Sequence, residues 1–125
     1  MKYIKLFVGA GCSILHYLFG AFDALLIALI AIVTFDYITG VLAAIYEKRL
    51  SSATGFRGIL KKVAILMVVA VAHIIGQIVG ADWMRSFVIG FYLANESISI
   101  LENAGKMNVG IPQKLLDVLE QLKKK

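Results

Sequence analysis

The apolar run from Ala24 to Tyr46 constrains this chain more than any other feature, because it contains a single charged residue, Asp36, near its middle. The run has 23 residues, which is long enough for a helix to cross the hydrocarbon core of a bilayer. A charge at the centre of such a helix costs about 2.5 kcal/mol or more, so it usually faces protein or a water-filled cavity. The chain therefore needs neighbouring helices that shield Asp36.

The composition indicates an integral membrane protein of one domain. The chain has 125 residues, and 60% of them are hydrophobic, whereas a soluble domain has about 45–50%. The net charge of +5 does not indicate nucleic-acid binding, because the basic residues flank apolar runs, as they do on the cytoplasmic side of a membrane. The single cysteine, Cys12, excludes an intrachain disulfide and paired-cysteine metal motifs.

Two further segments, 63–81 and 83–103, are predicted to cross the membrane beside the first. The inner half of 83–103 is polar from Asn95 onward, so a helix that leaves the membrane there is the alternative. The very short connection at 82–85 favours a helical hairpin instead. The predicted fold class is an all-α integral membrane protein, a single membrane domain over 1–125, with three to four transmembrane helices in a small bundle plus a short C-terminal cytoplasmic amphipathic helix.

The N-terminal hydrophobic helix, residues 6–22, has two interpretations that the sequence leaves open. Its 17 residues are near the lower limit for a spanning helix, and its face of small residues suits packing against another helix. The same segment also fits an amphipathic helix in the membrane interface. A cleaved signal peptide is disfavoured, because no convincing small-x-small site precedes a soluble domain. Gly20 is expected to end this helix and Asp23 to cap the next.

Residues 47–62 are predicted to form a basic cytoplasmic loop. The segment holds five basic residues and one acidic residue, a net charge of +4, and the positive-inside rule places such a loop in the cytoplasm. It lacks the Gly-Lys-Ser/Thr of a phosphate-binding loop, so contact with anionic headgroups is the simpler interpretation. The basic residues are Lys48, Arg49, Arg57, Lys61 and Lys62.

Residues 112–125 are predicted to form a cytoplasmic tail helix. Pro112 suits its first position, and Leu115, Leu119 and Leu122 form a narrow apolar stripe. The three final lysines are favourable at a helix C-terminus and agree with a cytoplasmic location. The expected localisation is the cytoplasmic membrane, with a multi-pass topology and a cytoplasmic C-terminus.

Three ionisable residues, Asp36, His73 and Glu96, are predicted to lie at one depth. They are 12, 11 and 10 residues from the nearest cytoplasmic basic residue, or roughly 18, 16 and 15 Å along a helix, which is near the midplane. They either form a satisfied polar cluster that holds the bundle in register, or face water in an assembly, and both interpretations stay open. The three basic reference residues are Lys48, Lys62 and Lys106. The small and polar residues expected with them are Thr39, Gly40, Gln77, Ser99 and Asn103.

The sequence predicts no catalytic site, no metal site and no cofactor. One histidine with two carboxylates is a poor zinc site. The serines lack a nucleophile motif such as Gly-x-Ser-x-Gly. A chain this short, occupied mostly by membrane helices, is not expected to be an enzyme.

Four short motifs follow one another along the chain. They are Asp36-x-x-Thr39-Gly40, Ser51-Ser52-x-x-Gly55-x-x-Gly58 with Lys61-Lys62, Asn95-Glu96-Ser97-Ile98-Ser99-Ile100-Leu101-Glu102-Asn103, and Gly110-Ile111-Pro112 with Leu115. With this order and this hydropathy, residues 20–122 resemble the phage lysis and toxin-secretion holin family, the group that includes the clostridial toxin-secretion holin.

This resemblance implies a small protein of the bacterial inner membrane that oligomerises and forms lesions at a set time. The lesions release an endolysin, or in some systems a toxin, and cause host-cell lysis. The implied partners are the lipid bilayer, further copies of the chain, an antiholin and, through function, an endolysin. Two alternatives remain: a small transporter that couples protons or cations through Asp36, His73 and Glu96, and a non-pore membrane accessory protein.

Overall fold

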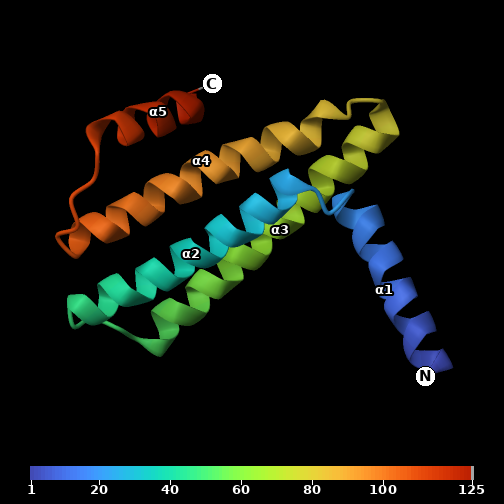
Figure 1. Ribbon diagram of the computed structural model, residues 1–125, viewed down its shortest axis with the longest axis horizontal. Coiled ribbons are helices and arrows are strands. Elements are labelled where there is room, and N and C mark those ends of the chain that lie inside the picture. Colours follow the sequence, from blue (N-terminus) through green and yellow to red (C-terminus); the bar gives the residue numbers. More distant parts are fainter. Residues whose placement is uncertain (125) are drawn as a thin grey trace.

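The computed structural model describes residues 1–124, and every regular element in that range is a helix (Figure 1). This confirms the predicted all-α class. The helices are α1 (Lys2–Phe19), α2 (Ala24–Tyr46), α3 (Ser52–Val79), α4 (Trp83–Lys106) and α5 (Gln113–Lys124).

A bundle of three helices, α2, α3 and α4, forms the body of the molecule (Figure 1). Its apolar core consists of Leu29 and Val33 from α2, Val69 from α3 and Ile89 from α4. Leu29, Val69 and Ile89 are completely buried. Because each helix contributes branched side chains at helical spacing to one interior, the three helices pack as a unit.

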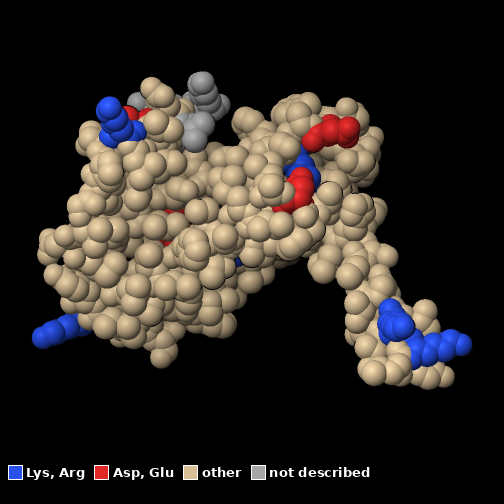
Figure 2. Space-filling view, in the orientation of Figure 1, with Lys and Arg blue, Asp and Glu red and all other residues tan. Residues whose placement is uncertain are grey.

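The outer surface of the bundle is strongly apolar. Large side chains such as Ile27, Phe35, Leu42 and Val71 are exposed, and most of the face in Figure 2 lacks charged side chains. The helices α2 and α3 are long and apolar enough to cross a bilayer. A contiguous apolar exterior of this kind is unusual for a soluble monomer and fits a surface that contacts lipid.

The segment 47–62, predicted as a loop, is helical from Ser52, so the connection between α2 and α3 is much shorter than expected. Ser51 accepts a hydrogen bond from the Thr54 amide at 3.1 Å and thereby caps α3. A Cβ on Gly58 would lie 3.4 Å from Tyr37 Cε2. Gly55 and Gly58 are thus helical residues, and the Tyr37 side chain of α2 lies next to them.

The two terminal helices lie outside this bundle. The N-terminal helix α1 extends away from it (Figure 1) and has no buried residue. The C-terminal helix α5 folds back along α4 (Figure 1), with Leu116 and Leu119 half-buried. Leu115 of the predicted stripe is 43% exposed. The side chain of Leu122 and those of the final lysines lie outside the described residues.

Candidate functional site

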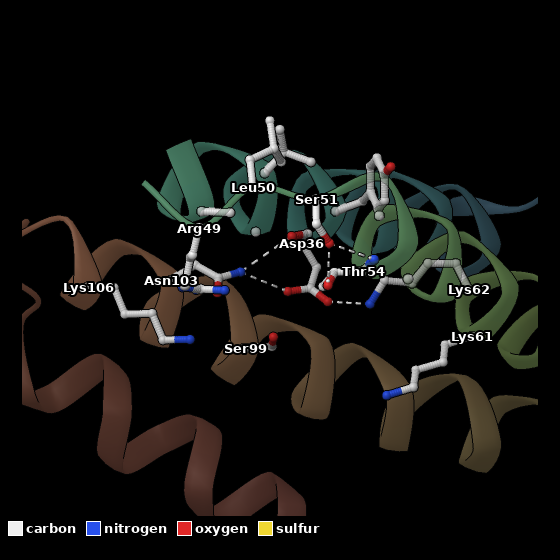
Figure 3. A pocket seen from close by; sticks show the side chains of 16 residues that line it. Asp36, Arg49, Leu50, Ser51, Thr54, Lys61, Lys62, Ser99, Asn103 and Lys106 are labelled. Atoms are coloured by element: carbon white, nitrogen blue, oxygen red, sulfur yellow. Dashed lines mark hydrogen bonds and ion pairs between the residues drawn. The ribbon is translucent and has the colours of Figure 1, made fainter. Parts of the chain in front are cut away.

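An ion cluster joins the three bundle helices; Figure 3 shows two of its members, Asp36 and Lys62, and the neighbouring Asn103. The Lys62 ammonium, from α3, donates hydrogen bonds to Asp36 of α2 and to Glu96 Oε1 of α4, the latter at 2.6 Å. Asp36 is 6% exposed and Glu96 4% exposed. Each helix therefore contributes one charged group to the cluster; the two carboxylates are almost completely buried, whereas the Lys62 side chain is 20% exposed.

An amide completes the cluster on the side of α2. Asn103 Nδ2 donates to Asp36 Oδ1 at 3.3 Å and to Thr39 Oγ1 at 3.0 Å. Thr39 in turn donates to the Phe35 carbonyl at 2.8 Å. Gly40 lies beside the same amide: a Cβ on it would be 3.6 Å from Asn103 Nδ2, an ordinary van der Waals contact. The spacing of Asp36, Thr39 and Gly40 thus serves one contact with Asn103.

The charges in the cluster are unequal, because two carboxylates face one ammonium. A buried ion pair loses solvation on both sides, and removal of one partner typically costs about 3–5 kcal/mol. Loss of Lys62 would leave the carboxylates of Asp36 and Glu96 close together without a cation between them. Among the described residues, every buried side-chain nitrogen or oxygen has a hydrogen-bond partner, so the site is satisfied as it stands.

His73 does not lie at the depth of Asp36 and Glu96, where the sequence predicted it, and it is not part of the cluster. It lies at the other end of the bundle, where a Cβ on Gly20 would come within 2.9 Å of His73 Cε1. Lys62 and His73 are 11 residues apart, which places them on one face of α3 but about 16 Å apart along it. The prediction used Lys62 as the marker for the membrane surface, whereas Lys62 is itself the partner of the two carboxylates.

The other predicted residues fall into two groups. Ser99, Arg49 and Lys61 line a pocket beside the cluster. Gln77, Lys48 and Arg57 are exposed. The described residues contain no group of three or more His, Cys, Asp or Glu side chains arranged to hold a metal.

A second polar junction, which sequence reasoning missed, fixes the turn between α1 and α2. Arg85 of α4 donates from Nε to the Phe19 carbonyl at 2.6 Å and from Nη2 to the Ala21 carbonyl at 2.9 Å. Its Nη1 also donates to Asp23 Oδ2 at 3.0 Å. The sequence held a signal for this junction: Arg85 is near the start of the predicted helix 83–103, and the predicted turn after Gly20 contains the acid Asp23.

The Arg85 guanidinium also changes the acidity of Asp23. Its hydrogen bonds, together with the Leu26 amide, lower the pKa of the Asp23 carboxyl from 3.8 to about 2. A carboxyl whose pKa is lower in the folded state stabilises that state above its unfolded pKa, and the contribution disappears as pH falls through the folded pKa.

We therefore expect the stability of the detergent-solubilised protein to fall as the pH is lowered from about 3.8 to about 2. In Arg85→Gln this loss of stability at low pH should be much smaller, because the neutral amide no longer favours the ionised form of Asp23. Thermal unfolding midpoints measured across that pH range test this. Equal pH dependence in both proteins would rule out the Arg85 contact as its cause.

The turn itself depends on Gly20. Gly20 has φ +79° and ψ −159°, a region that is largely restricted to glycine. We expect Gly20→Ala to destabilise the protein by about 1–3 kcal/mol, because the backbone is strained and the new methyl would meet His73 and Arg85. Chemical unfolding in detergent measures the change. Gly9→Ala is the matched control, since a Cβ there meets nothing within 4 Å, and similar losses in both variants would contradict the argument.

Comparisons with known proteins identify the family of this chain. The bacteriophage holin family matches residues 13–124. An uncharacterized protein of Listeria monocytogenes is 48% identical over 108 residues, covering 86% of this chain and 77% of its own. A 14.9 kDa protein encoded in the nagH 3′ region of Clostridium perfringens is 40% identical over 127 residues, covering 100% of this chain and 96% of its own. No solved structure shows significant similarity. The chain belongs to the bacteriophage holin family.

Proposed function

We propose that the protein is a holin, which accumulates in the bacterial inner membrane, oligomerises and forms lesions that release an endolysin or a toxin. The observation that carries this proposal is the Asp36–Lys62–Glu96 cluster, buried inside a bundle with an apolar exterior. Ionised groups in such a place are costly unless they are paired or wet. The cluster therefore provides two alternative packings, one with the charges paired internally and one with them facing water.

The helix α4 is the element best suited to change between these packings. Its inner face holds Glu96 and Asn103, both buried, whereas Phe87 and Phe91 are exposed on its outer side. In a lesion, several copies would turn this polar face toward a water-filled opening, while α2 and α3 remain in lipid. We propose α2, α3 and α4 as the membrane spans, with the basic α2–α3 turn and the C-terminus in the cytoplasm.

The test is expression in bacteria with and without a cytoplasmic cell-wall hydrolase. A holin should collapse the membrane potential abruptly in both cases, and should cause lysis when the hydrolase is present. It should also release a cytoplasmic reporter enzyme. Leakage of ions without the enzyme would favour the transporter alternative, and an unchanged membrane potential would favour the accessory alternative.

The position of His73 weakens the transporter alternative. A relay through Asp36, His73 and Glu96 needs the three groups within hydrogen-bond reach or bridged by water. His73 instead lies beside Gly20 at the opposite end of α3 from the cluster. An antiholin that delays triggering remains a proposed partner, and co-expression that delays the loss of membrane potential would identify it.

A further inference from the structure

A pocket of about 400 Å³ opens beside the ion cluster, between the end of α2, the first turns of α3 and the end of α4 (Figure 3). Small-molecule sites commonly have volumes of about 300–1,000 Å³. Its wall is mixed, with apolar side chains such as Val41 and Leu50 and several basic ones. The pocket therefore has room for a small amphiphilic group.

The basic residues give the pocket an excess of positive charge. Arg49, Lys61 and Lys106 line it, in addition to Lys62. The one acid in its lining, Asp36, is already bound by Lys62. Among the described side chains, Lys61 and Lys106 form no ion pair, and Arg49 is paired through Nε with the exposed Glu47. Two ammonium groups and part of a guanidinium thus remain available to an anion.

The position of the pocket along the bundle points to the kind of anion. Lys61 lies two residues before the apolar stretch of α3 that begins at Val63, and Lys106 ends α4. Basic residues at such boundaries lie at the level of lipid headgroups. Val41, Ala44 and Leu50 add apolar side chains to the same pocket. This arrangement matches a lipid, with a charged phosphate next to hydrocarbon.

We propose that this pocket binds the phosphate headgroup of an anionic phospholipid, with Lys61 and Lys106 as its main cationic contacts and Arg49 as a third. The bound lipid would link the α2–α3 turn to the end of α4, the two parts of the bundle that border the pocket. The proposal concerns lipid recognition by the folded protein and holds whether or not the protein forms lesions.

The experiment measures thermal unfolding of the full-length protein in a neutral detergent, with increasing amounts of a short-chain phosphatidylglycerol. The midpoint should rise with this lipid, but hardly at all with the matching zwitterionic phosphatidylcholine. In Lys61→Gln/Lys106→Gln, the lipid concentration needed for the same rise should increase about ten-fold, because two charge-assisted contacts are lost.

The matched control is Lys48→Gln/Arg57→Gln, which removes the same charge from exposed positions outside the pocket lining. It should change the required lipid concentration by less than about two-fold, as exposed charges contribute little. If both double variants needed the same increase in lipid concentration, the lipid would be attracted by overall charge and not by the pocket, and the proposal would be overturned. So would an equal rise with phosphatidylcholine, or the same rise with inorganic phosphate in place of the lipid.

Discussion

Replacement of Lys62 by methionine is expected to lower the free energy of unfolding by about 3–5 kcal/mol. The substitution keeps the length and apolar stem of the side chain but leaves Asp36 and Glu96 facing each other without their shared cation. Both carboxylates are more than nine-tenths buried, so water compensates little. Denaturant unfolding in detergent, followed by circular dichroism, measures the loss.

The neighbouring residue provides the control for this experiment. Lys61 carries the same charge one position earlier, but it is exposed and forms no ion pair among the described residues. Lys61→Met should therefore change the stability by no more than about 0.5 kcal/mol. If Lys62→Met proved as mild as this control, the cluster would not be a structural centre of the bundle.

The second large effect is expected when the whole cluster is made apolar. The triple variant Asp36→Leu, Lys62→Met, Glu96→Leu removes the charges together and leaves none of them unpaired. Replacement of a buried ion cluster by apolar residues is often neutral or stabilising, by about 1–4 kcal/mol. We expect the triple variant to fold and accumulate normally, in contrast to Lys62→Met alone.

Its function should nevertheless be lost if the proposed function is correct. Without the charges, the packing with α4 turned toward water gains less from hydration at this level, so the closed bundle is favoured. Cells that express the triple variant should keep their membrane potential well beyond the lysis time of the parent protein. Immunoblots confirm equal amounts in the membrane. If the triple variant accumulates normally and still lyses the cells at the usual time, the cluster has no role in triggering.

The sequence by itself predicted α2 and the turn before it. The run from Ala24 to Tyr46 is α2, residue for residue. Gly20 ends α1 and the Asp23 side chain accepts the Leu26 amide at 3.0 Å, as the turn chemistry indicated. These features depend on local propensity and on hydrophobic runs, and both can be read from adjacent residues.

The first turns of α3 could not be predicted in the same way. Serines and glycines from Ser51 to Gly58 indicate a loop when only local propensity is considered. In the folded protein, the Tyr37 ring of a different helix lies against Gly55 and Gly58. This contact and the Ser51 cap favour a helix here despite the low helix propensity of the glycines.

The partner of Asp36 was likewise decided by the tertiary structure. The sequence determined that a carboxylate within an apolar helix needs a shield, and it correctly indicated Glu96 and Asn103 as residues on an inward face. It could not determine that the cation is Lys62 and not His73, because both lie on one face of α3 and differ only in height. That height depends on where α3 begins and how it is aligned with α2 and α4, which the packing of Leu29, Val69 and Ile89 sets. Helical periodicity gives the direction of a side chain, whereas the pairing of buried charges depends on the register between helices, which only the folded bundle fixes.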